Sequence, residues 1–180
     1  MAYYSDTELT AIGFRSIGSN VKISKKASFY DSQQISIGSN VRIDDFCILS
    51  GNITLGNYIH ISAYSALYGK YEIEMKDFTG LSPRCTVFSA TDDFSGEYMI
   101  SPMVPSELTN VNGGKVLIER FAQVGANTVI LPNVVIAEGS AIGAMSLVRF
   151  STKKWGIYAG IPSKFIKRRS QKILELFRSI

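Results

Sequence analysis

One aliphatic residue recurs at every sixth position over two long stretches of this chain. The recurring positions are Ile37, Ile43, Leu49, Leu55, Ile61, Leu67 and Ile73, and then Ile118, Val124, Ile130, Ile136, Ile142 and Val148. A period of six fits neither an α-helix, with its period of 3.6, nor a strand, with its period of two. It fits a parallel β-helix, in which each hexapeptide is one flat side of a three-sided coil. The sequence therefore predicts an all-β prism whose core is filled by these residues.

The composition agrees with a single soluble domain. The chain has 180 residues, of which 46% are hydrophobic, enough to fill one core. No apolar run is long enough to span a membrane, and the first eight residues lack the basic stretch of a signal peptide. We therefore expect a cytoplasmic protein without membrane insertion.

The two cysteines and the single histidine limit the metal chemistry of the chain. Cys47 and Cys85 lie within the repeats without a CxxC partner, so we expect both to be small core residues. His60 is the only histidine, which excludes a zinc carbonic anhydrase built on three histidine ligands. No metal site is predicted.

The region before the first coil is predicted to be an N-terminal cap, residues 1–16. Ser5 followed by Glu8 makes a capping-box pattern, and Gly13 is a helix stop, so a short helix is expected over residues 6–12. Because an open solenoid end exposes its core, we expect this helix to cover the end of the prism.

The remainder of the single domain divides into a β-helix and a tail. The β-helix is predicted over residues 17–154, interrupted by a loop at 92–115 that is rich in turn residues and long enough to suggest a function. Residues 155–180 are interpreted as an exit turn followed, from Ser163, by a C-terminal amphipathic α-helix.

Positive charge is concentrated in the last part of the chain. From Arg149 onward there are nine basic residues and one acid, so this segment carries +8 while residues 1–148 carry −4. Such a run is either a solvated helix face or a binding site for a polyanion. No nucleic-acid motif accompanies it, so a phosphorylated cofactor fits better than a nucleic acid.

Three features together resemble a known enzyme family: the hexapeptide coils, the late interrupting loop, and the sequence Ala-Gly-Ile-Pro-Ser-Lys at residues 159–164. The chain resembles the hexapeptide-repeat acyltransferases, the galactoside, maltose and nucleotide-amino-sugar acetyltransferases among them. The resemblance implies a left-handed β-helix, a homotrimer with active sites between neighbouring prisms, and acetyl-CoA as the acyl donor.

Two groups of residues are expected to bind the donor. Small residues at coil corners would let backbone amides reach the pantetheine arm of CoA, although the coil itself also favours small residues there. The phosphates of CoA need cations. The candidates are Gly125, Ala126, Gly143 and Ala144 for the arm, and Lys164, Lys167 and Arg168 for the phosphates.

The interrupting loop departs from the family pattern at its catalytic position. Maltose-type relatives have a stretch similar to Tyr-Thr-Ala-Thr-His, whereas residues 88–93 here read Phe-Ser-Ala-Thr-Asp-Asp. Asp92 or Asp93 therefore replaces the general base. An aspartate with its ordinary pKa of about 3.9 is a poor base for a sugar hydroxyl, but an amine needs only orientation and a proton acceptor. Either aspartate is thus a catalytic or substrate-binding candidate for an amino sugar, or a turn residue.

Further candidates surround the expected acceptor site. His60 is either a structural residue or a catalytic contact across the trimer interface. Arg84 would bind a diphosphate in a bidentate manner, or it is a surface residue. Tyr64 and Tyr68 would stack on a base or sugar, or pack subunits together.

These interpretations lead to one main hypothesis and two alternatives. The main hypothesis is an acetyl-CoA-dependent N-acetyltransferase that acts on a nucleotide-linked amino-deoxy sugar, most narrowly a dTDP-4-amino-4,6-dideoxyhexose, for a bacterial surface polysaccharide. The first alternative is a sugar O-acetyltransferase with His60 as its base. The second is a non-catalytic trimeric scaffold, which the basic tail argues against because a scaffold needs no CoA site.

Overall fold

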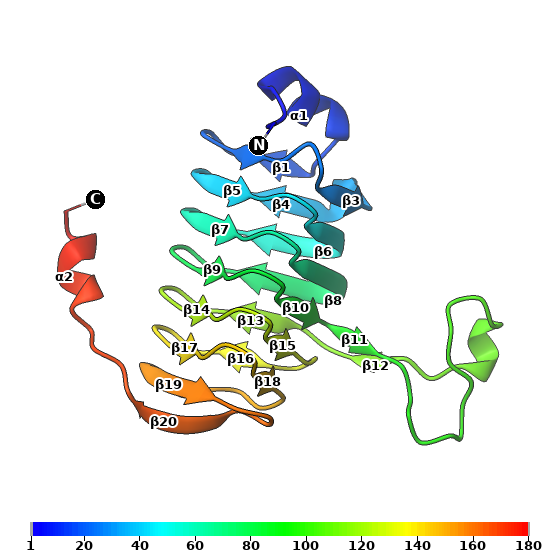
Figure 1. Cartoon of the computed structure of the whole chain (residues 1–180). Coiled ribbons are helices and arrows are strands. Elements are labelled where there is room, and N and C mark those ends of the chain that lie inside the picture. Colours follow the sequence, from blue (N-terminus) through cyan, green and yellow to red (C-terminus); the bar gives the residue numbers. More distant parts are fainter. Residues whose placement is uncertain (1, 180) are drawn as a thin grey trace.

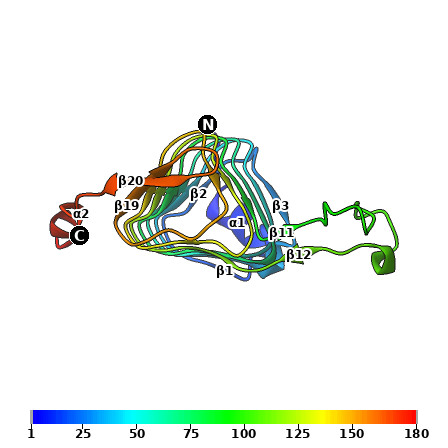
Figure 2. The ribbon, with the colours of Figure 1, turned by 90° about the horizontal axis from the view of Figure 1, so that it is seen from below.

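The computed structural model describes residues 2–179 and shows a three-sided prism of stacked coils (Figure 1). Viewed along its axis, the prism has a triangular outline with a filled interior (Figure 2). Consecutive coils pair through parallel strands, as in Ile37 with Leu55 and Leu55 with Met75. This is the left-handed parallel β-helix that the sequence predicts.

Each coil passes through three sides, which we number in chain order. Side 1 contains β1 (Ser16–Ile17), β4 (Ile35–Ile37), β13 (Val116–Ile118), β16 (Val135–Ile136) and the later parts of β6 (Ile48–Leu55) and β8 (Ala66–Met75). Side 2 contains β2 (Lys22–Ile23), β5 (Val41–Ile43), β7 (Ile59–Ile61), β9 (Gly80–Leu81), β14 (Gln123–Val124), β17 (Ala141–Ile142) and β19 (Gly156–Ala159). Side 3 contains β3 (Ser28–Tyr30), β10 (Thr86–Phe88), β15 (Val129–Ile130), β18 (Leu147–Val148) and the earlier parts of β6 and β8.

The core consists of the residues that recur every sixth position. All of those named above are at most 3% exposed, which confirms the predicted inward positions. Coils approach so closely at the corners that a Cβ on Gly38 would lie 2.4 Å from the carbonyl oxygen of Gly56, so only glycine fits there. Eight residues rather than six separate Phe29 from Ile37, and the 3-10 turn η1 (Ser32–Gln34) accommodates the two extra residues.

The N-terminal helix α1 (Asp6–Ile12) covers the first coil. Ser5 and Glu8 form the predicted capping box, and Gly13 ends the helix with a left-handed φ of 76°. Leu9 is buried in the core of the prism, so α1 closes this end as expected.

The tail differs from its prediction in two respects. β19 pairs in parallel with β17, so the chain does not leave the prism at residue 155 but continues side 2 for one more coil. It then turns back as β20 (Lys164–Arg168), antiparallel to β19, and the predicted helix is confined to α2 (Ile173–Phe177). The interpretation of residues 163–172 as helix is therefore wrong. The physical reason is that the last coil has a free strand edge, and β20 satisfies its backbone groups.

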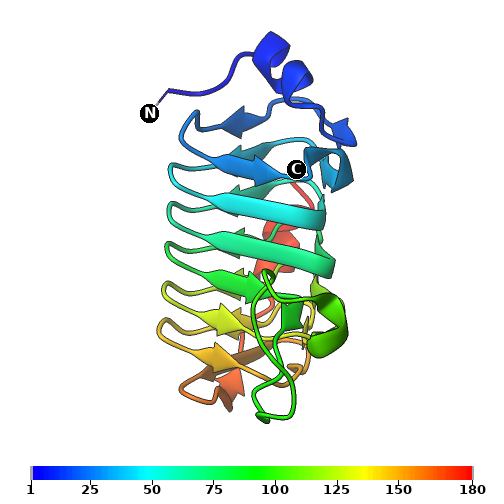
Figure 3. The same cartoon turned by 90° about the vertical axis from the view of Figure 1, so that its right-hand side faces the viewer.

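Two segments project from the prism. Residues 92–111, here called the arm, extend from the corner between sides 3 and 1, with β11 (Ala90–Thr91) and β12 (Asn112–Gly113) paired at its base and the 3-10 turn η2 (Ser106–Leu108) within it (Figure 3). On the opposite side of the prism, α2 lies back along the coils (Figures 1 and 2). Neither helix in the described part of the chain is long and apolar enough to cross a membrane.

Candidate active site

The two aspartates at the start of the arm have different environments. Asp93 accepts hydrogen bonds from the backbone N–H of Ser95 at 2.7 Å and from Nδ2 of Asn110 at 2.8 Å. These bonds, chiefly those from Ser95, lower the pKa of Asp93 below its ordinary value. Asp93 therefore tightens the turn that begins the arm, which is the turn-residue alternative left open by the sequence.

Asp92 is the aspartate that faces open space. It lies at the junction of two hollows beneath the arm, one lined by Phe88, Phe94 and Leu131, the other by Tyr68 and Lys70. Within residues 2–179 no hydrogen bond to the Asp92 carboxylate is found, so this group is available to a ligand. The structure thus brings two of the predicted residues, Asp92 and Tyr68, to one place.

The base of the arm is held by contacts with the third coil. Lys115 bridges Glu74 at 2.6 Å and Glu72 at 3.0 Å, and these hydrogen bonds raise the pKa of Lys115. The buried hydroxyl of Ser89 donates to the carbonyl of Tyr68 and accepts from the backbone N–H of Tyr71. These contacts therefore fix the position of the chain from which Asp92 projects.

His60 lies on side 2, away from the arm. Its Nε2 is 2.8 Å from Oδ2 of Asp44, whose Oδ1 accepts a 2.7 Å hydrogen bond from Nε of Arg42. Both His60 and Arg42 line a hollow on side 2 that also includes Ser62, Ser82 and others. The full lining is Asn40, Arg42, Tyr58, Ile59, His60, Ser62, Phe78, Thr79, Gly80, Leu81, Ser82, Gln123 and Ile173.

The corner between sides 2 and 3 carries another predicted pair. Tyr64 stacks on Phe46 with 4.9 Å between ring centroids, and the guanidinium of Arg84 lies 5.6 Å from the Tyr64 ring. The rings of Phe46 and Tyr64 are exposed, as a stacking platform requires. Tyr68, by contrast, stacks on Phe88 at 5.3 Å on side 3 and belongs with Asp92.

The small residues continue this same corner in the next two coils. Gly125 and Ala126 follow β14, and Gly143 and Ala144 follow β17. A Cβ on Gly125 would lie 2.5 Å from the backbone nitrogen of Ala144, so the coil stacking itself requires glycine there. The strip formed by these four small residues carries no large side chain, although Asn127 and Met145 are exposed beside it on the same corner, below the platform of Tyr64 and Arg84.

The three predicted phosphate-binding cations are spread along β20 because it is a strand. Lys164 pairs with Ala159, near the corner that carries the small residues, and Lys167 pairs with Ile157. Arg168 pairs with Gly156 at the other end of β20. There it lines a hollow with Lys153, Lys154, Tyr158 and Phe165, plus Ser151.

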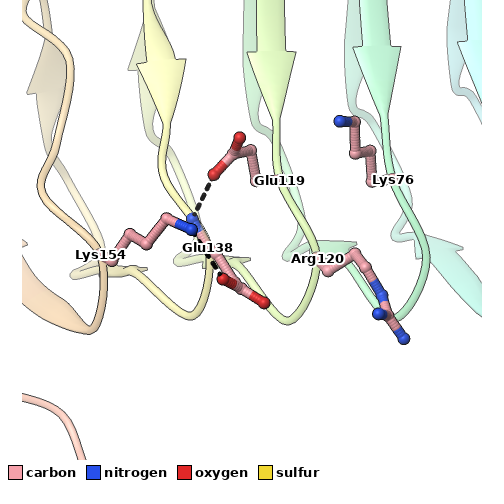
Figure 4. Close-up of a pocket in the computed structure, with 5 residues that line it drawn as sticks. All are labelled: Lys76, Glu119, Arg120, Glu138 and Lys154. Atoms are coloured by element: carbon pink, nitrogen blue, oxygen red, sulfur yellow. Dashed lines mark hydrogen bonds and ion pairs between the residues drawn. The ribbon is translucent and has the colours of Figure 1, made fainter.

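A further charged hollow, shown in Figure 4, lies on the corner between sides 1 and 2. Hydrogen bonds link its charged residues from coil to coil: Glu138 accepts from Lys154 at 3.0 Å, which raises the pKa of Lys154, and Glu119 accepts from the backbone N–H of Glu138 at 2.8 Å. Arg120 lies over the rings of Phe121 and Phe177. These contacts tie neighbouring coils together and leave little net charge for an anion.

The two cysteines are core residues, as expected. Cys47 and Cys85 are buried free thiols, and burial raises the pKa of each to about 11, so neither is a reactive thiolate. Over residues 2–179 no cluster of three or more His, Cys, Asp or Glu side chains is present.

In one chain the predicted site residues form separate groups. Asp92 and Tyr68 lie under the arm, Tyr64 and Arg84 on one corner, and His60 on side 2. Sequence reasoning missed the residues around His60, namely Arg42, Asp44 and Ser82. The sequence did contain a signal for Arg42, because residues 18 apart stack in adjacent coils, as Arg42 and His60 do.

Comparison with known proteins gives this site a context. No model of a known protein family matches the sequence. The chain is 46% identical over 179 residues to the dTDP-4-amino-4,6-dideoxy-D-glucose acyltransferase of Escherichia coli, covering 98% of this chain and 93% of that protein. The crystal structure of AntD, an N-acyltransferase from Bacillus cereus in complex with dTDP and 3-hydroxybutyryl-CoA, matches with a TM-score of 0.96 at 53% identity, covering 98% of this chain and 95% of that one. A hexapeptide transferase family protein from Anaplasma phagocytophilum, 17% identical, shares the fold with a TM-score of 0.59 over 93% of this chain and 92% of its own.

The proteins that this chain matches over nearly its whole length are hexapeptide-repeat acyltransferases. The chain belongs to this family.

Proposed function

We propose that this protein is an acyl-CoA-dependent N-acyltransferase that acylates the amino group of dTDP-4-amino-4,6-dideoxyglucose. The observation that carries the proposal is the match with AntD over nearly the whole chain at 53% identity, because AntD has been crystallised with that amino sugar and coenzyme A bound together. The replacement of the family histidine by aspartate supports an amine acceptor independently. The cytoplasm, which supplies acyl-CoA donors, remains the compartment that we propose.

Two residues gain support from the AntD variants. Those crystal structures include substitutions of a serine and of an aspartate ten positions further on. Ser82 and Asp92 are the one serine–aspartate pair with this spacing in the present sequence. Because the two chains align almost end to end, we assign Ser82, which lines the side 2 hollow, and Asp92, which lies under the arm, to the acceptor site.

The proposed reaction requires orientation more than a strong base. The neutral amine of the sugar attacks the thioester carbonyl carbon, the C–S bond of the donor breaks, and the proton lost by nitrogen ends on the sulfur of free CoA. Asp92 would accept hydrogen bonds from the amine and aim its lone pair at the carbonyl, a contribution of positioning. Asp93 is already committed to its turn and has no such role.

The donor would lie along the corner between sides 2 and 3. Below the platform of Tyr64 and Arg84, the small residues at Gly125 and Gly143 would let an extended pantetheine lie against the backbone, beside the exposed side chains of Asn127 and Met145. Lys164 lies at the end of this corner and would meet a phosphate. Lys167 and Arg168 stay predictions, and Arg168 has the separate hollow with Lys153 and Lys154 as an alternative phosphate site.

We further propose that the active form is a homotrimer. One outward row of side 3 is largely apolar. It consists of Ile48, Ala66, Thr86, Val129 and Leu147. The arm also exposes Phe94 (84%) and Met103 (90%), which a second chain would cover. Light scattering should give three times 19.8 kDa. A monomer at micromolar concentration would contradict a site built between chains.

The test of function is a thiol-release assay with paired substrates. We expect turnover with dTDP-4-amino-4,6-dideoxyglucose and none with a free hexose or a galactoside. Acetyl-CoA is the predicted donor, and 3-hydroxybutyryl-CoA, the donor seen with AntD, is the comparison. Turnover of the free sugars alone would favour the O-acetyltransferase, and no turnover of any substrate would favour the scaffold.

The two phosphate hypotheses are separated by single charge reversals. Lys164→Glu should raise the KM for acyl-CoA roughly 10- to 100-fold, the equivalent of a charged hydrogen bond of about 1.5–3 kcal/mol. Arg168→Glu tests the other end of β20, and Lys172→Glu, further along the tail, is the control for net charge. If all three variants shift KM equally, the effect is general electrostatics and neither site is supported.

A further inference from the structure

Asp44 occupies an unusual position for a carboxylate. It follows the last residue of β5 and is only 6% exposed, whereas its two partners, Arg42 and His60, are about half exposed and point into the side 2 hollow. A buried carboxylate is costly unless its oxygens accept hydrogen bonds. Here each oxygen accepts one, from Nε of Arg42 and from Nε2 of His60. The buried Asp44 carboxylate thus holds two surface side chains in place through hydrogen bonds.

The hydrogen bond between Asp44 and His60 determines which ring nitrogen of His60 carries the proton. An ionised carboxylate can only accept hydrogen bonds, so Nε2 must be the donor, and in the neutral ring Nδ1 is left as the acceptor. The strand pair β7–β9 places Gly80 next to His60. The side chain of Gln123 lies over Gly80, with its Oε1 2.8 Å from where a Cβ on Gly80 would be, and Gln123 and Ser82 line the hollow beside the imidazole.

We propose that Asp44 is a positioning residue that holds His60 as its Nε2–H tautomer and so presents Nδ1 as the proton acceptor for acyl transfer. When the amine has attacked the thioester, Nδ1 takes the proton from the positively charged nitrogen, the C–S bond breaks, and the imidazolium returns this proton to the departing thiolate. This inference rests on the proposed function and adds the route of the proton to it.

The single histidine makes the tautomer directly measurable. Two-bond and three-bond 1H–15N correlations of the 15N-labelled imidazole, recorded at alkaline pH where an imidazole is neutral, distinguish Nε2–H from Nδ1–H. We expect the wild-type trimer to show Nε2–H. Asp44→Asn should give a mixture of tautomers, because an amide can donate as well as accept. Asp45→Asn is the matched control, since Asp45 instead accepts from Ser24 and pairs with Lys26.

Kinetics then separate positioning from a merely structural role. With the amino sugar and acyl-CoA, Asp44→Asn should lower kcat roughly 10-fold with little change in either KM, a part of what a general base contributes. The His60→Asn, Asp44→Asn double variant should be no slower than His60→Asn alone, because Asp44 acts through His60.

Three results would overturn the proposal: Nδ1–H in the wild type, an unchanged tautomer in Asp44→Asn, or a kcat loss that adds to that of His60→Asn. The spectroscopic part does not depend on the identity of the substrate. Suppose that no amino sugar is turned over, but that the wild type shows Nε2–H and Asp44→Asn alters the tautomer. The proposed function and the route of the proton then both fail, while the role of Asp44 in holding the imidazole ring stands.

Discussion

One side chain of the C-terminal helix α2, Phe177, makes three aromatic or cation–π contacts with the prism, and these permit a quantitative prediction. Phe177 meets Phe78 and Phe121 edge-on, with centroids 5.1 Å and 5.4 Å away, and the guanidinium of Arg120 lies 5.1 Å from its ring. An aromatic pair contributes about 0.5–1.5 kcal/mol beyond its buried area, and an exposed cation–π contact about 0.5–1 kcal/mol. Phe177→Ala should therefore weaken docking of α2 by about 1.5–4 kcal/mol.

A loss of this size raises the ratio of undocked to docked α2 roughly 10- to 1,000-fold, since 1.4 kcal/mol is a factor of ten. The coils themselves should stay folded, because their core does not include Phe177. Cleavage by trypsin after Lys172, followed by mass spectrometry, should accelerate by a comparable factor, because proteolysis follows the open population when opening is fast. Fluorescence of Trp155, the single tryptophan, should also change, since it stacks on Phe121.

The control is Leu176→Ala, the neighbouring residue in α2, whose side chain is 65% exposed. It should leave both the cleavage rate and the fluorescence as they are. Ile173 of α2 also lines the hollow with His60, so release of α2 should raise the KM of the substrate bound there. Equal cleavage rates in Phe177→Ala and the wild type would show that other contacts hold α2 and would refute this reasoning.

Three further predictions concern the arm and the tail. Gly113→Ala should lower kcat/KM with little loss of Tm, because its Cβ would lie 2.3 Å from the carbonyl of Ser89 and displace the arm that carries Asp92. The pKa of Asp93 is lowered, so its stabilisation of the arm is present at neutral pH and should be lost only in acid, below about pH 4, as measured by hydrogen exchange of the arm. Arg169→Gln should lower the free energy of unfolding by about 1–3 kcal/mol, because the guanidinium donates to the carbonyls of Phe121 and Gly139 at 2.8 Å and 3.0 Å.

The hexapeptide period predicted the core because each coil repeats one local geometry. Whether a residue such as Leu49 or Ile130 points inward follows from its phase in the repeat, and no distant contact is needed. The capping box of α1 is likewise a local pattern of Ser5 and Glu8. These parts of the fold could therefore be predicted from sequence alone.

Other features depend on partners that lie far apart in the chain. The segment of Phe165 and Ile166 has apolar spacing compatible with a helix, and only the free edge of β19 makes it a strand. Asp92 and Asp93 are equivalent in sequence, and the difference between them comes in part from Asn110 on the returning segment of the arm. Pairing of Asp44 with His60 similarly requires two successive coils to be stacked.

The separation of the site residues within one chain leads to a last prediction. Asp92 leaves the corner between sides 3 and 1, while His60 and Ser82 lie on side 2, and the filled core separates these surfaces. If both groups serve one reaction, they must come from different chains of the proposed trimer. Trimers mixed from Asp92→Asn and His60→Asn chains would then regain sites that have both wild-type groups, and their kcat should exceed that of either parent. Mixed trimers no more active than the average of the parents would mean that the two residues do not share a site across subunits.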